Sequence, residues 1–267
     1  MRLPRRVRRV LHPRRWRKRT RQVNHPIGPD LDDDVLQDME RDSGALLVAF
    51  GGLAGWFLEV PPFEMVRSTG DLPVKRMFVR DSRQAWYHRG IRGHGDTFMS
   101  LAESLGELLG RYEVERLVMT GISMGGYAAL AFGTLLGADT VLALVPQTVV
   151  DMRTLAAMDD HRWDEQLGEL DRAGDADPRW LDLRSALPGA RVADTRYEIY
   201  FAQRFRTDRL HAERMAGIDG VRLYRFGHGG HALARALRDN GVMETVMRRA
   251  LGLPGGPLAA IGRGPVS

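Results

Sequence analysis

The sequence contains no cysteine, and this absence excludes disulfide bonds, thiol catalysis and cysteine-ligated metal sites. It also lacks any run of about 18 apolar residues, so no transmembrane helix is expected. The histidines do not have the His-Glu-x-x-His spacing, and neither a P-loop nor a dinucleotide-binding glycine pattern is present. We therefore expect no metal and no cofactor. Because an apolar secretory signal is also missing, we expect a cytoplasmic protein.

Acidic residues are absent from residues 1–22, which hold eleven Arg and Lys residues. The whole chain has a net charge of +5, so the remainder carries −6 and is acidic. We expect residues 1–44 to form a basic, disordered arm followed by an acidic linker, and residues 252–267 to form a loose tail. The arm is either a solvated extension or a contact for anionic membrane lipid or nucleic acid. Its single aromatic residue, Trp16, gives little support for stacking on bases.

Between these ends, short apolar runs alternate with helix-forming segments. We predict strands within 45–55, 75–81, 115–121, 140–148, 196–203 and 221–227, and helices within 100–110, 127–137, 231–241 and 242–251. This alternation predicts an α/β protein with a mostly parallel, doubly wound sheet that is covered by helices on both faces. The predicted folded domain spans residues 45–251.

Residues 149–190 interrupt the alternation, because they contain no clear strand. Within them, residues 151–184 hold ten acidic residues against five basic ones, together with Trp163 and Trp180. We interpret the segment as a helical lid over the carboxyl ends of the strands, where sheets of this kind bind ligands. A solvated helical insertion anchored by its two tryptophans is the alternative.

The segment GISMGG at 121–126 has the G-x-S-x-G pattern of a nucleophile elbow, with Ser123 as the candidate nucleophile. The composition gives about 0.1 such matches by chance, so the context has to carry the prediction. A predicted strand precedes the motif and a predicted helix follows it, as an elbow requires. Gly121 and Gly125 supply the small neighbours that a sharp strand-to-helix turn needs.

A serine hydroxyl needs a base, and the base needs an orienting acid. The segment FGHGGHALARAL after the last predicted strand offers His231, with His228 as the backup. Asp208 is the first carboxylate after the preceding predicted strand, although an aspartate there could also cap a helix. Asp151 is the alternative acid.

An acyl-transfer site also needs hydrogen-bond donors for the oxyanion. We predict the backbone N–H of Met124, which follows the nucleophile, and a second N–H from Gly52 or Leu53 in the loop FGGLAG. In the segment VRDSRQAWYHRG, four side chains are possible substrate-binding groups, namely Arg80, Trp86, Tyr87 and His88. A structural loop in which Arg80 pairs with Asp81 is the alternative.

In these motifs the chain resembles the α/β-hydrolase family of serine hydrolases, and the segment at 79–90 is similar to one in bacterial α/β-hydrolase-like proteins. The resemblance covers residues 45–251 and implies a Ser123–His231–Asp208 triad with an acyl-serine intermediate. Many family members carry His-Gly in the oxyanion loop, whereas this chain has Phe50-Gly51. The resemblance does not name a substrate, because fold alone does not decide it.

We expect a carboxylesterase that acts on a small or medium ester. An acyltransferase that uses the same triad is a second possibility. A non-catalytic binding protein with a hydrolase scaffold, working through its basic arm, is a third, and a contact of the acidic insertion with a basic partner is a fourth. Sequence gives no indication of the oligomeric state.

Overall fold

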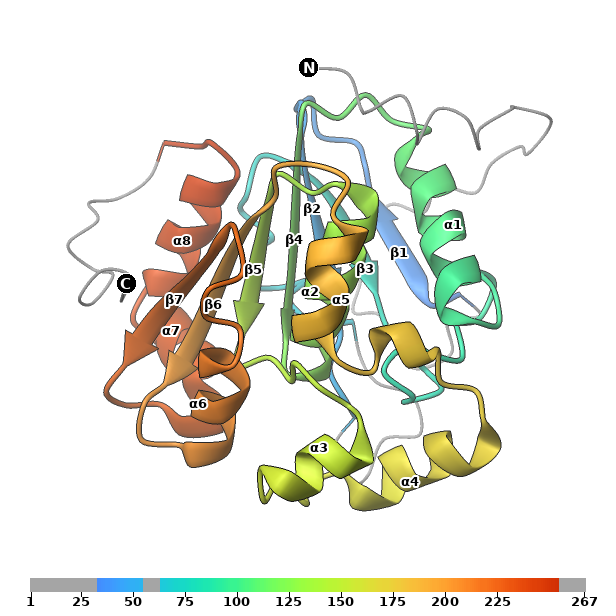
Figure 1. Ribbon diagram of the computed structural model, residues 1–267. Coiled ribbons are helices and arrows are strands. Elements are labelled where there is room, and N and C mark those ends of the chain that lie inside the picture. Colours follow the sequence, from blue (N-terminus) through green and yellow to red (C-terminus); the bar gives the residue numbers. More distant parts are fainter. Residues whose placement is uncertain (1–32, 55–62, 255–267) are drawn as a thin grey trace.

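The computed structural model describes residues 33–54 and 63–254, so the predicted basic arm and residues 255–267 of the predicted tail lie outside it. In this described part, a seven-stranded sheet has the order β1-β3-β2-β4-β5-β6-β7 (Figure 1). The strands are β1 (Val35–Asp38), β2 (Ala45–Phe50), β3 (Lys75–Val79), β4 (Arg116–Ile122), β5 (Thr140–Leu144), β6 (Arg196–Ala202) and β7 (Val221–Phe226). Each neighbouring pair is parallel except β1 and β3. The prediction of a mostly parallel sheet is therefore confirmed.

Helices cover both faces of this sheet (Figure 1). They are α1 (Phe98–Leu109), α2 (Met124–Leu136), α3 (Met152–Ala157), α4 (Asp164–Ala173), α5 (Leu183–Ala190), α6 (Arg206–Glu213), α7 (Leu233–Asp239) and α8 (Val242–Ala250), with 3₁₀ turns η2 (Pro178–Trp180) and η3 (Gly230–Ala232). The core of one face includes α1, α2 and α5, and the core of the other includes α7 and α8. No helix in the described part of the chain is both long and apolar enough to cross a bilayer.

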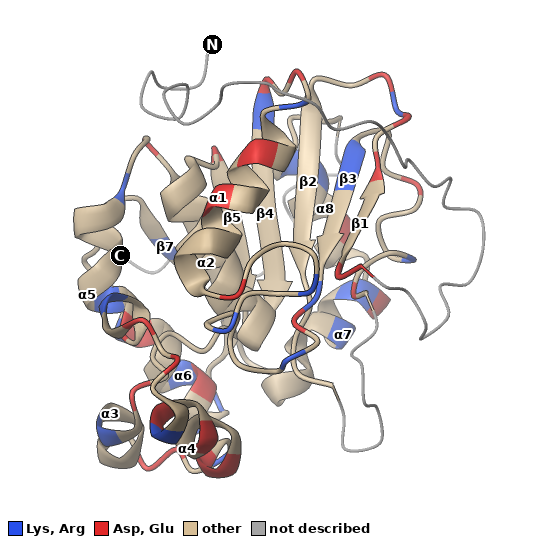
Figure 2. Ribbon diagram, turned by 90° about the vertical axis from the view of Figure 1, so that its right-hand side faces the viewer, with Lys and Arg blue, Asp and Glu red and all other residues tan. Residues whose placement is uncertain are grey.

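Alternating side chains of the central strands explain the two cores. In β2, Leu46 and Val48 face the α1–α2 side, while Leu47 belongs to the α7–α8 side. Strands buried on both faces are rich in continuous apolar residues, as β2 is throughout and β5 is after Thr140. Figure 2 shows these two strands without charge, whereas α4 carries both signs. The two central strands therefore carry no charge, whereas the segment between β5 and β6 is rich in charged residues.

The first strand corrects the predicted boundary at residue 44. Strand β1 lies within the expected acidic linker and pairs antiparallel with β3 at the sheet edge. Asp34 next to it is buried, and its carboxylate accepts hydrogen bonds from Arg80 Nε at 3.0 Å and from the Arg92 backbone at 3.0 Å. A four-residue edge strand with polar residues has no apolar run, so the sequence pattern did not reveal it.

The segment between β5 and β6 contains α3, α4, η2 and α5, as Figure 1 shows below and in front of the sheet. It is anchored to the domain core by Leu167, Leu170 and Trp180, which are all buried. Trp180 stacks on Phe98 of α1 with ring centroids 5.3 Å apart. We call residues 149–190 the insertion. Its helices and anchoring tryptophan are described by the structure, and its action as a lid stays a prediction.

Candidate active site

Ser123 lies on the tight turn between β4 and α2. Its backbone has φ of 55° and ψ of −115°, a conformation that side-chain-bearing residues rarely adopt. A Cβ atom at Gly121 would lie 2.1 Å from the carbonyl oxygen of Gly125, and one at Gly125 would lie 2.2 Å from that of Phe50. Both glycines are therefore required by close backbone packing. A half-buried serine held in this way has the geometry of a nucleophile elbow.

The structure brings His231 and Asp208 together from separate segments. His231 lies in η3 after β7, and its Nδ1 is 2.9 Å and 3.0 Å from the two carboxylate oxygens of Asp208. Asp208 lies in the first turn of α6 and its side chain is 1% exposed, whereas that of His231 is 36% exposed. Phe205 is the N-cap of this helix, so Asp208 is not a cap. Nδ1 therefore faces the acid, and Nε2 is left for another group.

The two backup residues have other surroundings. His228 is exposed, and its ring forms no hydrogen bond or ion pair with the residues that the structure describes. Asp151 caps α3 by accepting hydrogen bonds from Thr154 N at 2.7 Å and Thr154 Oγ1 at 2.6 Å. Within the described residues, the only carboxylate that contacts the ring of His231 is thus Asp208.

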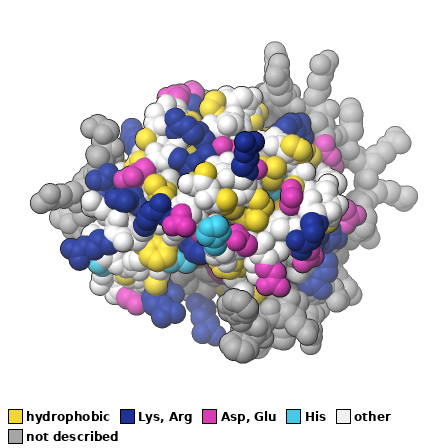
Figure 3. Space-filling model, turned by 60° about the horizontal axis from the view of Figure 1, so that its bottom comes forward, with side chains coloured by type: hydrophobic (Ala, Val, Ile, Leu, Met, Phe, Trp, Pro, Cys, Tyr) yellow, Lys and Arg dark blue, Asp and Glu magenta, His cyan; other side chains and the backbone are white. Residues whose placement is uncertain are grey.

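Ser123 and His231 approach the same edge of the sheet but do not bond. The Ser123 hydroxyl forms no hydrogen bond with any described residue, His231 included. Catalytic hydrogen bonds are often long before substrate binds, so proton transfer from Ser123 to His231 is compatible with this geometry and stays a proposal. Figure 3 looks onto that edge and shows histidine near its middle, among hydrophobic, acidic and basic side chains.

The predicted oxyanion loop carries a carboxyl group that the sequence did not indicate. The backbone N–H of Gly52 donates to the carboxylate of Glu64, whose Oε2 is buried and has no hydrogen-bond partner among the residues that the structure describes. Burial raises the pKa of Glu64 to about 7, although the Gly52 bond opposes this shift. In this arrangement the Gly52 N–H is not free for an oxyanion. The backbone N–H groups of Met124, which begins α2, and of Leu53 stay as the predicted donors.

The predicted substrate-binding role of the four side chains at 80–88 has to be corrected, because each of these residues is at most 1% exposed. Arg80 pairs with Asp34 as described above, not with Asp81. Trp86 Nε1 donates to Gln147 Oε1 at 2.8 Å, and Tyr87 Oη donates to the carbonyl of Gly51 at 2.8 Å. The Trp86 and Tyr87 bonds thus join this segment to the loops after β5 and β2. The prediction of substrate binding rested on aromatic faces and an arginine, which can hold polar ligands but here contact the protein itself.

His88 connects this loop to the insertion. Its Nδ1 accepts from the backbone N–H of Asp177 at 3.1 Å, and its Nε2 lies 2.9 Å from Tyr127 Oη, which donates to the carbonyl of Trp180. Since Nδ1 is an acceptor and the Tyr127 hydroxyl donates its proton to Trp180, Nε2 has to be the donor to Tyr127 Oη. His88 is therefore neutral with its proton on Nε2. Burial lowers the pKa of His88 to about 4, against the opposing charge of Asp177.

This shift predicts a pH-dependent stability. The unfolded histidine takes up a proton below its ordinary pKa of 6.5, whereas the folded one resists protonation down to about 4, so stability falls as the pH falls through this window. We expect His88 to make the free energy of unfolding about 2 kcal/mol smaller at pH 5 than at pH 7.5. Urea unfolding of the native chain and of His88→Gln at both pH values measures this difference. An identical pH dependence in the two proteins would contradict a neutral buried His88.

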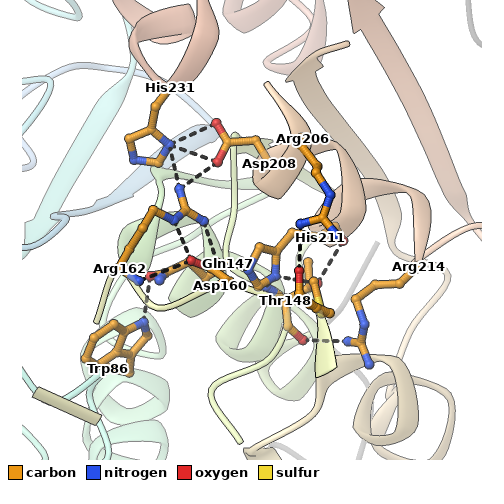
Figure 4. Close-up of polar contacts among 11 residues, drawn as sticks. Trp86, Gln147, Thr148, Asp160, Arg162, Arg206, Asp208, His211, Arg214 and His231 are labelled. Atoms are coloured by element: carbon orange, nitrogen blue, oxygen red, sulfur yellow. Dashed lines mark hydrogen bonds and ion pairs between the residues drawn. The ribbon is translucent and has the colours of Figure 1, made fainter. Parts of the chain in front are cut away.

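Three residues of the site were missed by sequence reasoning. The guanidinium of Arg162 in the insertion contacts Asp208 and forms two hydrogen bonds with Asp160, and Asp160 contacts His211 of α6 (Figure 4). Their sequence signals were the cluster DDHRW at 159–163 and the spacing of Asp208 and His211, which places both on one face of a helix. Neither signal identifies a partner, because the partners are distant in the chain.

No protein-family model matches the chain, and no curated protein matches it in sequence. Solved structures do match. The capsule O-acetyltransferase of Neisseria meningitidis serogroup A has a TM-score of 0.61 and 13% identity, over 80% of this chain and 90% of that one. An esterase of Pyrococcus furiosus has a TM-score of 0.51 and 12% identity, over 80% and 85%. A hydrolase from Oleispira antarctica has a TM-score of 0.50 and 13% identity, over 83% and 95%. With its sheet order and elbow, the chain therefore has the α/β-hydrolase fold.

Proposed function

We propose that this protein is a serine hydrolase, and that it acts as a carboxylesterase on small or medium esters. The observation that carries the proposal is the combination of Ser123 on a strained elbow with a His231–Asp208 pair. The three residues follow the chain order of serine, acid and histidine that this fold uses. The likeness to esterases adds support at the level of the fold.

In the proposed reaction, Ser123 Oγ attacks the ester carbonyl while His231 Nε2 takes the hydroxyl proton. Asp208 holds the imidazole through Nδ1 and stabilises the imidazolium that forms. The N–H groups of Met124 and Leu53 bind the oxyanion. Collapse of the tetrahedral intermediate releases the alcohol, which takes the proton from His231. Water then attacks the acyl-serine by the same steps and releases the acid.

An acyltransferase is the second candidate, and the likeness to an O-acetyltransferase at a TM-score of 0.61 favours it. A variant of that acetyltransferase has been solved in complex with CoA. By this analogy, the acyl donor would be a CoA thioester and an acceptor alcohol would replace water in the second step. The chemistry at Ser123 is the same for both candidates. The contribution of the basic arm to either stays a prediction.

The proposal is tested by labelling with a fluorophosphonate probe, with Ser123→Ala as the comparison. We expect covalent modification at Ser123 in the native chain and none in the variant, because only an activated serine reacts with the probe. Folded native protein that is not labelled would reject the triad and favour a binding protein. Hydrolysis of p-nitrophenyl esters of increasing chain length follows. CoA release from acetyl-CoA, with and without an added alcohol, separates the transferase from the hydrolase.

A further inference from the structure

Arg162 lies between two buried carboxylates, in the turn between α3 and α4 (Figure 4). Its Nη1 donates to Asp208 Oδ1 at 2.9 Å. Its Nε and Nη2 donate to the two carboxylate oxygens of Asp160 at 2.8 Å and 2.7 Å. Both carboxylates are 1% exposed, and the arginine side chain is 22% exposed. A guanidinium group is suited to this position, because its planar set of donors can satisfy two acids at once.

The second carboxylate is itself held by α6. Asp160 Oδ2 lies 3.0 Å from His211 Nε2, and His211 Nδ1 accepts from the backbone N–H of Thr148 at 3.0 Å. His211 Nδ1 is thus an acceptor, so the proton lies on Nε2 and points at Asp160. Burial lowers the pKa of His211 despite the nearby acid, which agrees with a neutral ring. The Asp160 carboxylate is therefore held by His211 of α6 at Oδ2 and by Arg162 at both oxygens.

The ion pair between Arg162 and Asp160 keeps both side chains charged. Burial alone would raise the pKa of Asp160, but the hydrogen bonds from Arg162 and His211 outweigh it and hold that pKa well below its usual range. Burial likewise opposes the charge on Arg162, but its bonds to Asp160 raise the pKa of the guanidinium. Near neutral pH, one cation therefore lies between two anions. Further polar contacts join the insertion to α6, from Arg206 to the carbonyl of Met158 and from Arg214 to Asp182.

We propose that Arg162 is a positioning residue for the triad, which holds the Asp208 carboxylate toward His231 and makes the triad geometry depend on docking of the insertion onto α6. This inference rests on the proposed function. Asp208 Oδ1 accepts from Arg162 and lies 3.0 Å from His231 Nδ1, and Oδ2 lies 2.9 Å from the same nitrogen, so a displacement of the carboxylate that breaks the Arg162 bond would also change its contact with His231. The insertion thereby acts on catalysis through the acid, without contact with the reacting atoms.

Arg162 also acts on the charge of His231. Its Nη1 lies 3.5 Å from His231 Nδ1, so the positive guanidinium and the Asp208 carboxylate act on the ring with opposite sign. Among the described residues, the side chain of Phe205 also packs near this ring, with ring centroids 6.0 Å apart, and the Arg162 guanidinium is itself paired with the Asp160 carboxylate. Removal of the guanidinium should therefore move the acidic limb of the activity profile to higher pH. A purely structural arginine would not move it.

The test measures fluorophosphonate labelling rates and kcat/KM for ester hydrolysis against pH. Arg162→Gln should lower both by about tenfold to a hundredfold at the optimum, because the acid loses its orientation. Its acidic limb should move up by about one pH unit. Arg162→Lys should keep the limb in place and recover part of the rate. Asp160→Asn, which loosens Arg162 without contacting Asp208, should lower the rate.

Arg179→Gln is the matched control, because it removes another Arg–Asp pair of the insertion, at 71% exposure of the arginine. It should leave the rate within about twofold. Urea unfolding of each variant separates lost folding from lost positioning. If native protein is labelled at Ser123 but Arg162→Gln reacts at the native rate with the native pH profile, the inference is wrong and the proposed function stands. If folded native protein is not labelled, both are wrong.

Discussion

Replacing His231 with glutamine is expected to lower kcat/KM for ester hydrolysis by about 10⁴-fold or more, because the serine loses its general base. The same substitution at His228 should leave the rate within about twofold, since that ring is exposed and contacts no carboxylate in the described part of the chain. The two histidines lie three residues apart in one glycine-rich loop, so each variant is the control for the other. Steady-state kinetics with a p-nitrophenyl ester measures both.

Comparable losses in the two variants would mean that the loop, and not the base, had been changed. A large loss in His228→Gln alone would reverse the assignment, and would require the loop to rearrange so that His228 reaches Asp208. Labelling of Ser123 offers a second readout that does not depend on the choice of ester. The label should be slow in His231→Gln and normal in His228→Gln, because the probe also needs an activated hydroxyl.

The sheet and the elbow were predictable because they depend on short-range signals. The run ALLVAF is apolar at every position and the run TVLAL at every position but Thr140, and all of these residues are buried, as is typical of strands covered on both faces. Gly137, the last residue of the predicted helix segment 127–137, caps the end of α2 in the left-handed conformation with φ of 68°. Serine between two glycines, with a strand on one side and a helix on the other, then places Ser123 on the turn.

The surroundings of the site were not predictable in this way. Arg80, Trp86, Tyr87 and His88 were possible substrate-binding groups because of their charged and aromatic side chains, yet Asp34 and Gln147 accept hydrogen bonds from Arg80 and Trp86 across long distances in the sequence, and the four side chains are buried. Glu64 on the Gly52 N–H and Arg162 on Asp208 are also contacts between distant segments. Periodicity describes which face of an element is apolar, but it does not describe which charged residues of separate loops meet.

Replacing Gly125 with alanine is expected to destabilise the fold by about 3 kcal/mol or to prevent folding. The new methyl group would lie 2.2 Å from the carbonyl oxygen of Phe50, and this neighbour is backbone of β2 that cannot rotate away. Because Phe50 leads into the loop that carries Gly52 and Leu53, the displacement should also slow the labelling of Ser123 in any protein that folds. Urea unfolding and the labelling rate measure the two effects.

Gly189→Ala is the matched control for this substitution. Gly189 lies in α5, where a methyl group would meet no atom within 4 Å, and alanine there should stabilise the chain by about 0.5 to 1 kcal/mol. If Gly125→Ala were as stable and as reactive as the native chain, α2 would not pack against β2 as closely as described. The elbow would then be an ordinary turn, and the argument that Ser123 is held in a strained, reactive conformation would lose its physical basis.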